Sequence, residues 1–126
     1  MGSITIESTV LIPCGRQDVY AFCVDEEARA GVAAQETVPV HIRDHVQDRS
    51  WTEIHEGRAE TITCSCVVYP VADSTRLTVT AQYAPKGFGR MFAAAKDGAY
   101  RKQEAARLAA LKKAVERAVR KAKNVQ

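Results

Sequence analysis

Two carboxylates, a histidine and a tyrosine could perform acid–base chemistry if the fold brings them together: Asp44, Glu53, His55 and Tyr83. A carboxylate removes a proton beside a carbonyl group, and a phenol donates a hydrogen bond to the enolate oxygen that forms. Adjacent carboxylates with a histidine nearby should have raised or coupled pKa values in apolar surroundings, which suits them to proton transfer. These four residues are the candidate catalytic residues, and the elements that carry them decide whether they meet.

Residues 36–84 alternate between apolar and polar side chains, the period-two pattern of antiparallel strands. We expect strands over 36–47, 50–56, 59–70 and 75–84. Two-residue turns at Asp48-Arg49 and Gly57-Arg58 would set Val46 opposite Trp51, Ile42 opposite His55 and Trp51 opposite Cys64. With a four-residue loop at 71–74, the same registers align one row across four strands, made of Asp44, Glu53, Ile62 and Tyr83.

This row would lie on the inner, apolar face of the sheet, where ionised carboxylates are costly unless they are paired or hydrated. The face would also hold Val38, Val40, Ile42, Val46, Trp51, Cys64, Cys66, Val68, Leu77, Val79 and Ala81. Three other interpretations stay open. The row lies at the open rim of the sheet in solvent, a bulge in one hairpin reverses the faces locally, or arginines from elsewhere pair with the acids.

The flanking segments predict one more strand and three helices. Residues 3–12 alternate as a half-buried strand, and residues 16–24 and 25–31 read as two short helices. Residues 87–123 predict one long helix with an apolar stripe on one face. Its first half is rich in small side chains such as Ala95 and Ala99, which would either bring backbones close together or leave room for a guest. Alanine is also the best helix former, so the pattern alone does not decide.

Length and composition predict one domain over residues 1–126, with an apolar content of 46%. No apolar run is long enough to cross a bilayer and no signal segment opens the chain, so we expect a cytoplasmic protein.

The net charge of +3 is unevenly distributed along the chain: from Lys86 onward 12 basic and three acidic residues give +9, which leaves −6 for residues 1–85. After Tyr100 no aromatic residue is interleaved with these cations, so we expect a solvated helix face in preference to a nucleic-acid-binding surface. The oligomeric state stays open.

The four cysteines form no recognised metal or redox motif: Cys14, Cys23, Cys64 and Cys66. The chain has no CxxC pair and no Cys/His cluster with zinc-ligand spacing. We therefore expect small buried thiols, with no metal and no cofactor.

Segments near both ends resemble the START-like, or SRPBCC, superfamily, in particular its polyketide cyclase/dehydrase-type members. The first is 10–13 (Val-Leu-Ile-Pro), followed by 18–22 (Asp-Val-Tyr-Ala-Phe) and Asp25. Residues 74–80 before Tyr83 resemble the family's late strand, and residues 108–116 resemble the end of its long helix. The resemblance implies an α+β helix-grip fold, in which a curved antiparallel sheet wraps around a long C-terminal helix. It also implies a cavity between the two for a polyketide, aromatic or lipid-like ligand.

Three functions follow as hypotheses. The first is a polyketide cyclase/dehydratase-like enzyme of natural-product biosynthesis, in which Glu53 or Asp44 removes a proton, His55 is its partner or the proton donor, and Tyr83 holds the enolate oxygen. The second is a ligand carrier or sequestering protein without chemistry. The third is an interaction protein whose basic C-terminal helix docks on an acidic partner or on nucleic acid. The expected ligand contacts are Trp51, Cys64, Cys66, Ala81, Phe88, Phe92, Ala95 and Ala99.

Overall fold

A computed structural model describes residues 3–32, 40–57, 60–86 and 97–124 of the chain. The elements follow the order β1 (Ile4–Ile12), α1 (Arg16–Cys23), α2 (Glu26–Ala30), β2 (Val40–Val46), β3 (Ser50–Glu56), β4 (Glu60–Val71), β5 (Ser74–Pro85) and α3 (Asp97–Asn124). The strand, the two short helices, the four-strand meander and the long helix all appear where the sequence predicts them. Residues 87–96 of the predicted long helix, among them Phe88, Phe92 and Ala95, lie outside the described residues.

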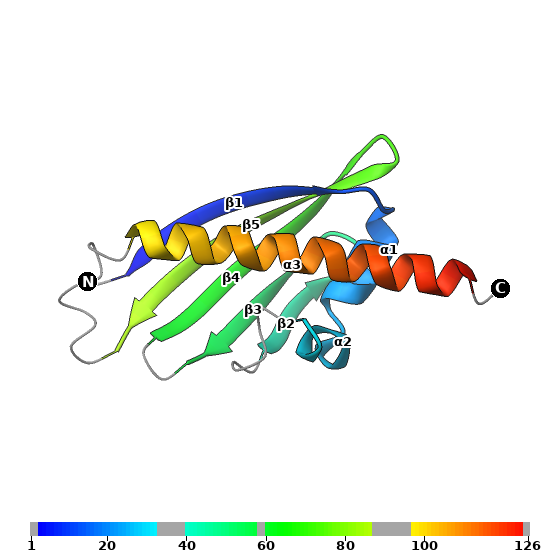
Figure 1. The fold of residues 1–126 in the computed structure, drawn as a ribbon. Coiled ribbons are helices and arrows are strands. Elements are labelled where there is room, and N and C mark those ends of the chain that lie inside the picture. The colour runs from blue at the N-terminus through cyan, green and yellow to red at the C-terminus, as the bar shows by residue number, and fades with distance from the viewer. Residues whose placement is uncertain (1–2, 33–39, 58–59, 87–96, 125–126) are drawn as a thin grey trace.

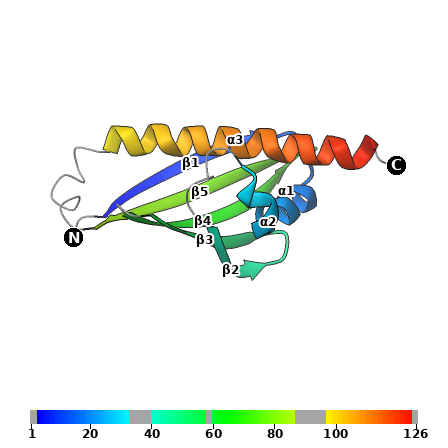
Figure 2. The same cartoon turned by 60° about the horizontal axis from the view of Figure 1, so that its bottom comes forward.

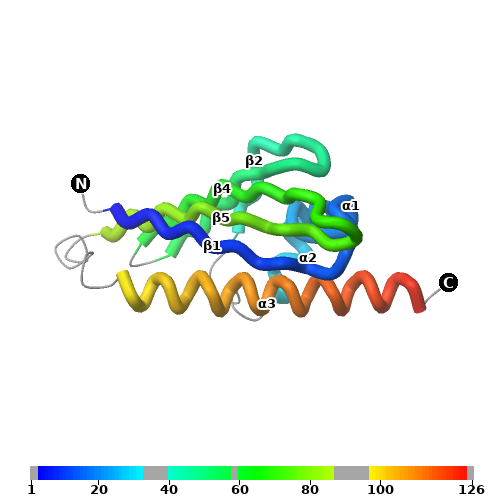
Figure 3. Tube along the Cα trace, turned by 90° about the horizontal axis from the view of Figure 1, so that it is seen from above, coloured from blue at the N-terminus to red at the C-terminus, as the bar shows by residue number. Residues whose placement is uncertain are grey.

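The five strands form one antiparallel sheet in the order β1-β5-β4-β3-β2. The sheet is curved, and α3 runs along its concave side, close to β1 (Figures 1 and 2). α1 and α2 lie together near the second half of α3 (Figure 3). This arrangement is the helix-grip α+β fold that the sequence predicts. No helix in the described ranges is long and apolar enough to span a membrane.

The inner face of α3 carries large side chains: Tyr100, Glu104, Arg107, Leu108, Leu111 and Val115 are all buried. Their spacing of three and four residues makes one stripe that faces the sheet. By contrast, Ala99, Ala105 and Ala106 are exposed. The expectation that Ala99 lines a ligand site is therefore wrong for the described part of α3, because the stripe that faces the sheet passes through Tyr100 and Glu104.

Two of the three hairpins keep the predicted faces. β4 and β5 pair as predicted, with Ile62 opposite Tyr83. β3 and β4 are shifted by two residues from the predicted register, so Glu53 lies opposite Cys64. A shift of two residues preserves the face, and Glu53 and His55 are buried on the inner side, 3% and 1% exposed.

The hairpin between β2 and β3 differs from the prediction because it contains a β-bulge. The register shifts between Arg43 and Val46, and Asp44 adopts a φ of 55°, in the left-handed region that Asp tolerates better than most residues. The bulge reverses the faces of the following residues, so Asp44 and Val46 are exposed, and Ile42 lies opposite Glu53. The prediction that Asp44 belongs to the inner row is therefore wrong, and Asp44 is separated from Glu53, His55 and Tyr83.

Candidate functional site

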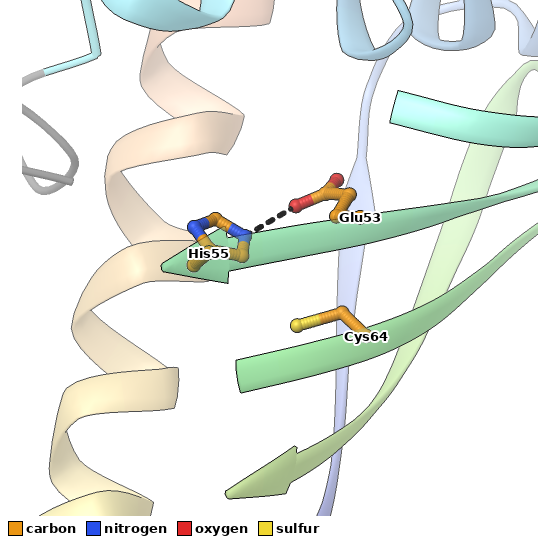
Figure 4. A group of neighbouring side chains, drawn as sticks. All are labelled: Glu53, His55 and Cys64. Atoms are coloured by element: carbon orange, nitrogen blue, oxygen red, sulfur yellow. Dashed lines mark hydrogen bonds and ion pairs between the residues drawn. The ribbon is translucent and has the colours of Figure 1, made fainter. Parts of the chain in front are cut away.

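The Glu53 carboxylate on β3 is the centre of a buried polar cluster (Figure 4). Its Oε2 accepts hydrogen bonds from Arg29 Nη1 at 2.5 Å, Trp51 Nε1 at 2.8 Å and Cys66 Sγ at 3.5 Å. Its Oε1 accepts from Arg29 Nη2 at 2.8 Å and lies 3.0 Å from His55 Nε2. Five donors therefore converge on a carboxylate that offers about four lone-pair positions.

Arg29 reaches this cluster because α2 holds it there. The Asp25 side chain caps α2 by accepting hydrogen bonds from the backbone N–H groups of Glu27 and Ala28, at 3.1 and 3.2 Å. The helix directs Arg29 inward, where the side chain is 1% exposed and Nη1 also donates to the Cys23 carbonyl at 3.0 Å. The two-point contact with Glu53 is the strong, planar form of an ion pair. An arginine from elsewhere therefore pairs with the buried acid, one of the alternatives that the sequence left open.

The Glu53 pKa moves in the direction opposite to the sequence expectation. Burial alone would raise it, but the charge of Arg29 and the hydrogen bonds from Arg29 and His55 hold the pKa well below the ordinary value of 4.5. Glu53 is thus a carboxylate at neutral pH and a weak base, because its conjugate acid is strong. Its part in any proton transfer must be to orient another group.

His55 is the group that Glu53 orients. Burial lowers the histidine pKa from 6.5 and the charge of Arg107 lowers it further, while the contact with Glu53 opposes both, so the ring is neutral at neutral pH. A carboxylate can only accept, so the neutral ring carries its proton on Nε2 and leaves Nδ1 as an acceptor. Figure 4 shows the second ring nitrogen on the side away from Glu53. Among the described residues, no group makes a hydrogen bond to Nδ1.

A second buried cluster joins β5 to α3. The Tyr83 hydroxyl donates to Glu104 Oε2, and Arg107 Nη2 donates to both carboxylate oxygens of Glu104. The Tyr100 ring stacks on Tyr83 with centroids 3.9 Å apart. Burial and the contact with Glu104 raise the Tyr83 pKa far above 10.0, so its hydroxyl keeps its proton. Tyr83 lies in the interior as predicted, but its donor is used within the protein.

Cys64 connects the two clusters. It lies opposite Glu53 in the sheet, and its Sγ accepts a hydrogen bond from Arg107 Nη2 at 3.3 Å. Burial raises the pKa of the Cys64 thiol to about 12, so the sulfur stays protonated. Trp51, Cys64, Cys66 and Ala81 are all buried on the inner face, where the sequence places them.

The ligating atoms of Glu53, His55 and Cys64 all lie within 4.8 Å of one another, close enough for a shared metal ion. The donor set argues against one. The lone pairs of Glu53 are already occupied by its five donors, and both arginines bring positive charge next to the position a cation would take. A metal would have to displace the Arg29 ion pair, so we assign no metal to these residues.

Sequence reasoning missed three buried charged residues, Arg29, Glu104 and Arg107. Arg29 is separated from its partner by 24 residues, and nothing in a short helix of alternating charge singles it out. Glu104 and Arg107 were detectable, because they continue the apolar stripe of Leu108, Leu111 and Val115 toward the start of the helix. A charged pair on the buried stripe of a helix is the signal that could have found them.

Several solved protein structures have a fold similar to that of this chain. A protein of unknown function, SA2116 from Staphylococcus aureus, matches with a TM-score of 0.73 at 7% identity over 94% of this chain and 96% of its own. A START superfamily protein from Mycobacterium smegmatis matches with a TM-score of 0.66 at 13% identity over 93% of this chain and 97% of its own. The di-domain ARO/CYC protein StfQ of the steffimycin biosynthetic pathway gives 0.66 at 9% identity over 93% of this chain and 52% of its own.

No protein-family model matches the sequence. No curated protein matches it either. At identities this low the structural likeness establishes the fold alone. The architecture and these neighbours together show that the chain has the helix-grip fold of START-like proteins.

Proposed function

We propose that the protein binds an apolar small molecule with a carbonyl group between the sheet and α3, and acts on it by proton transfer as a polyketide cyclase/dehydratase-like enzyme. The fold is shared with a START superfamily protein and with the ARO/CYC protein StfQ, which supports a hydrophobic ligand. Small-molecule sites combine an apolar lining with a few placed polar groups. The inner face has this composition, with Trp51, Ile62 and Ala81 beside His55 and Arg107.

The observation that carries the proposal is the contact between Glu53 Oε1 and His55 Nε2 at 3.0 Å. A neutral imidazole whose one nitrogen is fixed by a carboxylate presents its other nitrogen as a base, the logic by which a carboxylate orients a catalytic histidine. His55 Nδ1 would take the proton beside the carbonyl, and the negative Glu53 would stabilise the imidazolium that forms. In this assignment His55 is the catalytic residue and Glu53 is a positioning residue, in place of the direct role that the sequence suggested for Glu53.

Arg107 is suited to hold the carbonyl oxygen of the ligand. Its Nη2 is committed to Glu104 and Cys64, and among the described residues no hydrogen bond is made by its Nε or Nη1. Its Nη2 lies 3.3 Å from Cys64 Sγ, and this sulfur lies within 4.8 Å of a ring nitrogen of His55, so the cation is close to the base. A fixed cation near the developing enolate oxygen stabilises the transition state more than the ground state. Tyr83 and Glu104 would then keep Arg107 in position.

The proposal is tested by native mass spectrometry of the protein purified from its own host, followed by turnover assays on the recovered compound. We expect an apolar carbonyl compound, and we expect His55→Gln to reduce turnover by roughly a hundredfold or more while it still binds the compound. His41→Gln, at an exposed histidine on β2, is the matched control and should change neither property. A His55→Gln variant with the turnover of the wild type would refute the catalytic role.

A carrier function is the second candidate, and one observation favours it. The two buried carboxylates in the described residues, Glu53 and Glu104, are both held in ion pairs and neither is free to act as a base. A carrier would need the polar groups only to orient its ligand. Release of the recovered compound unchanged after prolonged incubation with the wild-type protein would favour the carrier over the enzyme.

A further inference from the structure

The two edges of the sheet are protected very differently. β2 forms one edge, and its backbone is interrupted by the bulge at Asp44. The Ile42 N–H on this edge donates to Glu26 Oε2 of α2 at 2.9 Å, so a side chain satisfies it. Bulges and covered N–H groups are the usual means of preventing a sheet edge from pairing with another chain.

β1 forms the other edge and has neither protection. Its pairing with β5 is regular along all nine residues, without a bulge. The strand contains no proline and no lysine between Ile4 and Ile12. Among the described residues, no strand pairs with β1 on the side away from β5. An unpaired edge with regular geometry is a template for one more strand.

A groove of about 650 Å³ lies directly beside this edge, between β1 and α3. Val10, Leu108, Ala105 and Ala109 give it an apolar lining, and Lys112 and Lys113 add two cations. Figure 3 shows α3 running beside β1 over the length of the strand. A strand added to β1 could therefore place alternate side chains in this groove.

The charged side chains around the groove indicate which kind of peptide would bind there. Glu116 is the one acid among the groove residues, against two lysines. Beyond this lining, the exposed cations Lys102 and Arg120 of α3 stand against the exposed acid Glu7 of β1, so cations still outnumber acids around the groove. We propose that the β1 edge and the adjoining groove bind an extended acidic peptide segment of another protein, which adds to the sheet as a further strand with its carboxylates near Lys112 and Lys113.

A second copy of this chain fits the same edge less well. Two β1 strands paired antiparallel about a two-fold axis would form one continuous sheet, with both α3 helices on the same face. Each α3 lies beside its own β1 (Figure 3), so Lys112 and Lys113 of the two copies would approach one another. Like charges placed together at an interface oppose association.

The proposal is tested by selecting random peptides of about the length of β1, displayed on phage, against the wild-type protein. We expect enriched sequences in which Asp or Glu alternates with small or β-branched apolar residues. Lys112→Glu combined with Lys113→Glu should weaken the enriched peptide by roughly tenfold or more. Arg117→Glu combined with Lys121→Glu makes the same charge change at exposed positions of α3 that lie toward α1 and α2 instead of this groove, and should have a much smaller effect.

Two further reagents test the geometry. Ala109→Phe fills the groove from an exposed position, so it should abolish binding without unfolding the protein. A peptide with alternate backbone amides methylated keeps its charges but cannot pair with β1, and it should not bind. The proposal would be overturned if no peptide were enriched, if the enriched peptides lacked acidic residues, or if the methylated peptide bound as well as the unmethylated one. It would also be overturned if the protein dimerised with rising concentration and Ala109→Phe abolished the dimer. The interior site is untouched by these changes, so the outcome is independent of the proposed ligand chemistry.

Discussion

Arg29 of α2 and Glu53 of β3 form a two-point ion pair in the interior, with N–O distances of 2.5 and 2.8 Å. Both side chains are almost fully buried. This pair fixes the carboxylate that contacts His55, so it joins the packing of a short helix on the sheet to the chemistry proposed for the site. Its geometry leads to predictions about stability, pH dependence and reactivity that need no knowledge of the ligand.

Removal of one partner should be strongly destabilising, because it leaves an unpaired charge in the core. We expect Arg29→Met to lower the free energy of unfolding by about 3–5 kcal/mol, measured by urea denaturation. Arg29→Met combined with Glu53→Leu should cost less than the single change, since no charge is then left alone. Arg101→Ala breaks the exposed pair with Asp97 and should cost only about 0.5 kcal/mol. An Arg29→Met variant as stable as Arg101→Ala would contradict the account.

Stability should fall in two steps as the pH is lowered, because both pKa values are depressed in the folded state. Below the ordinary histidine pKa of 6.5 the unfolded chain protonates His55 more readily than the folded one, so stability declines from there. Below the ordinary glutamate value of 4.5 the Glu53 contribution declines as well, and it is lost as the pH passes through the depressed folded-state pKa. Urea denaturation across this range should show the first step in the wild type and its loss in His55→Gln. An identical pH profile for both proteins would rule out a depressed pKa at His55.

The inner cysteines should be inert in the folded protein. Burial raises the pKa of Cys23 and Cys64 to about 12 and that of Cys66 well above 9.0, so almost no thiolate is present at neutral pH. Iodoacetamide treatment followed by peptide mass analysis should label these three residues only after denaturation. Rapid labelling of Cys64 or Cys66 in the native protein would mean that the space beneath the sheet is open to reagents.

Substitutions of Asp44 should change the stability of the protein through the backbone conformation and should not change ligand binding. Its φ of 55° suits Gly or Asn, whereas a β-branched residue is strained there, so Asp44→Val should cost about 1–2 kcal/mol and Asp44→Gly much less. Urea denaturation measures both. Asp44→Asn should leave ligand binding unchanged, and a large loss of binding in that variant would return Asp44 to the site.

The sequence predicts the sheet better than the site because alternation reports which face a residue occupies but not its exact partner. Glu53, His55 and Tyr83 point inward as the period of two requires, even though the β3–β4 register is shifted by two residues. The prediction that Asp44 lies on the inner face fails because the apolar positions Val40, Ile42 and Val46 keep an even spacing across the bulge. Spacing alone cannot reveal an inserted residue.

The polar contacts of the site depend on packing between distant segments, which local patterns do not encode. Arg29 meets Glu53 only because α2 packs under the curved sheet. Tyr83 meets Glu104 only because the inner stripe of α3 continues beyond its apolar residues. The resemblance to START-like proteins predicts the arrangement of the elements, but it does not specify these contacts.

The central claim is that Glu53 holds His55 as a neutral imidazole with its proton on Nε2 and its Nδ1 free to accept. Nitrogen-15 NMR of the histidine side chains at neutral pH measures this directly in the folded protein. The account predicts a protonated Nε2, an unprotonated Nδ1 and a His55 pKa below 6.5. A ring protonated on Nδ1, or one that is doubly protonated at neutral pH, would contradict it.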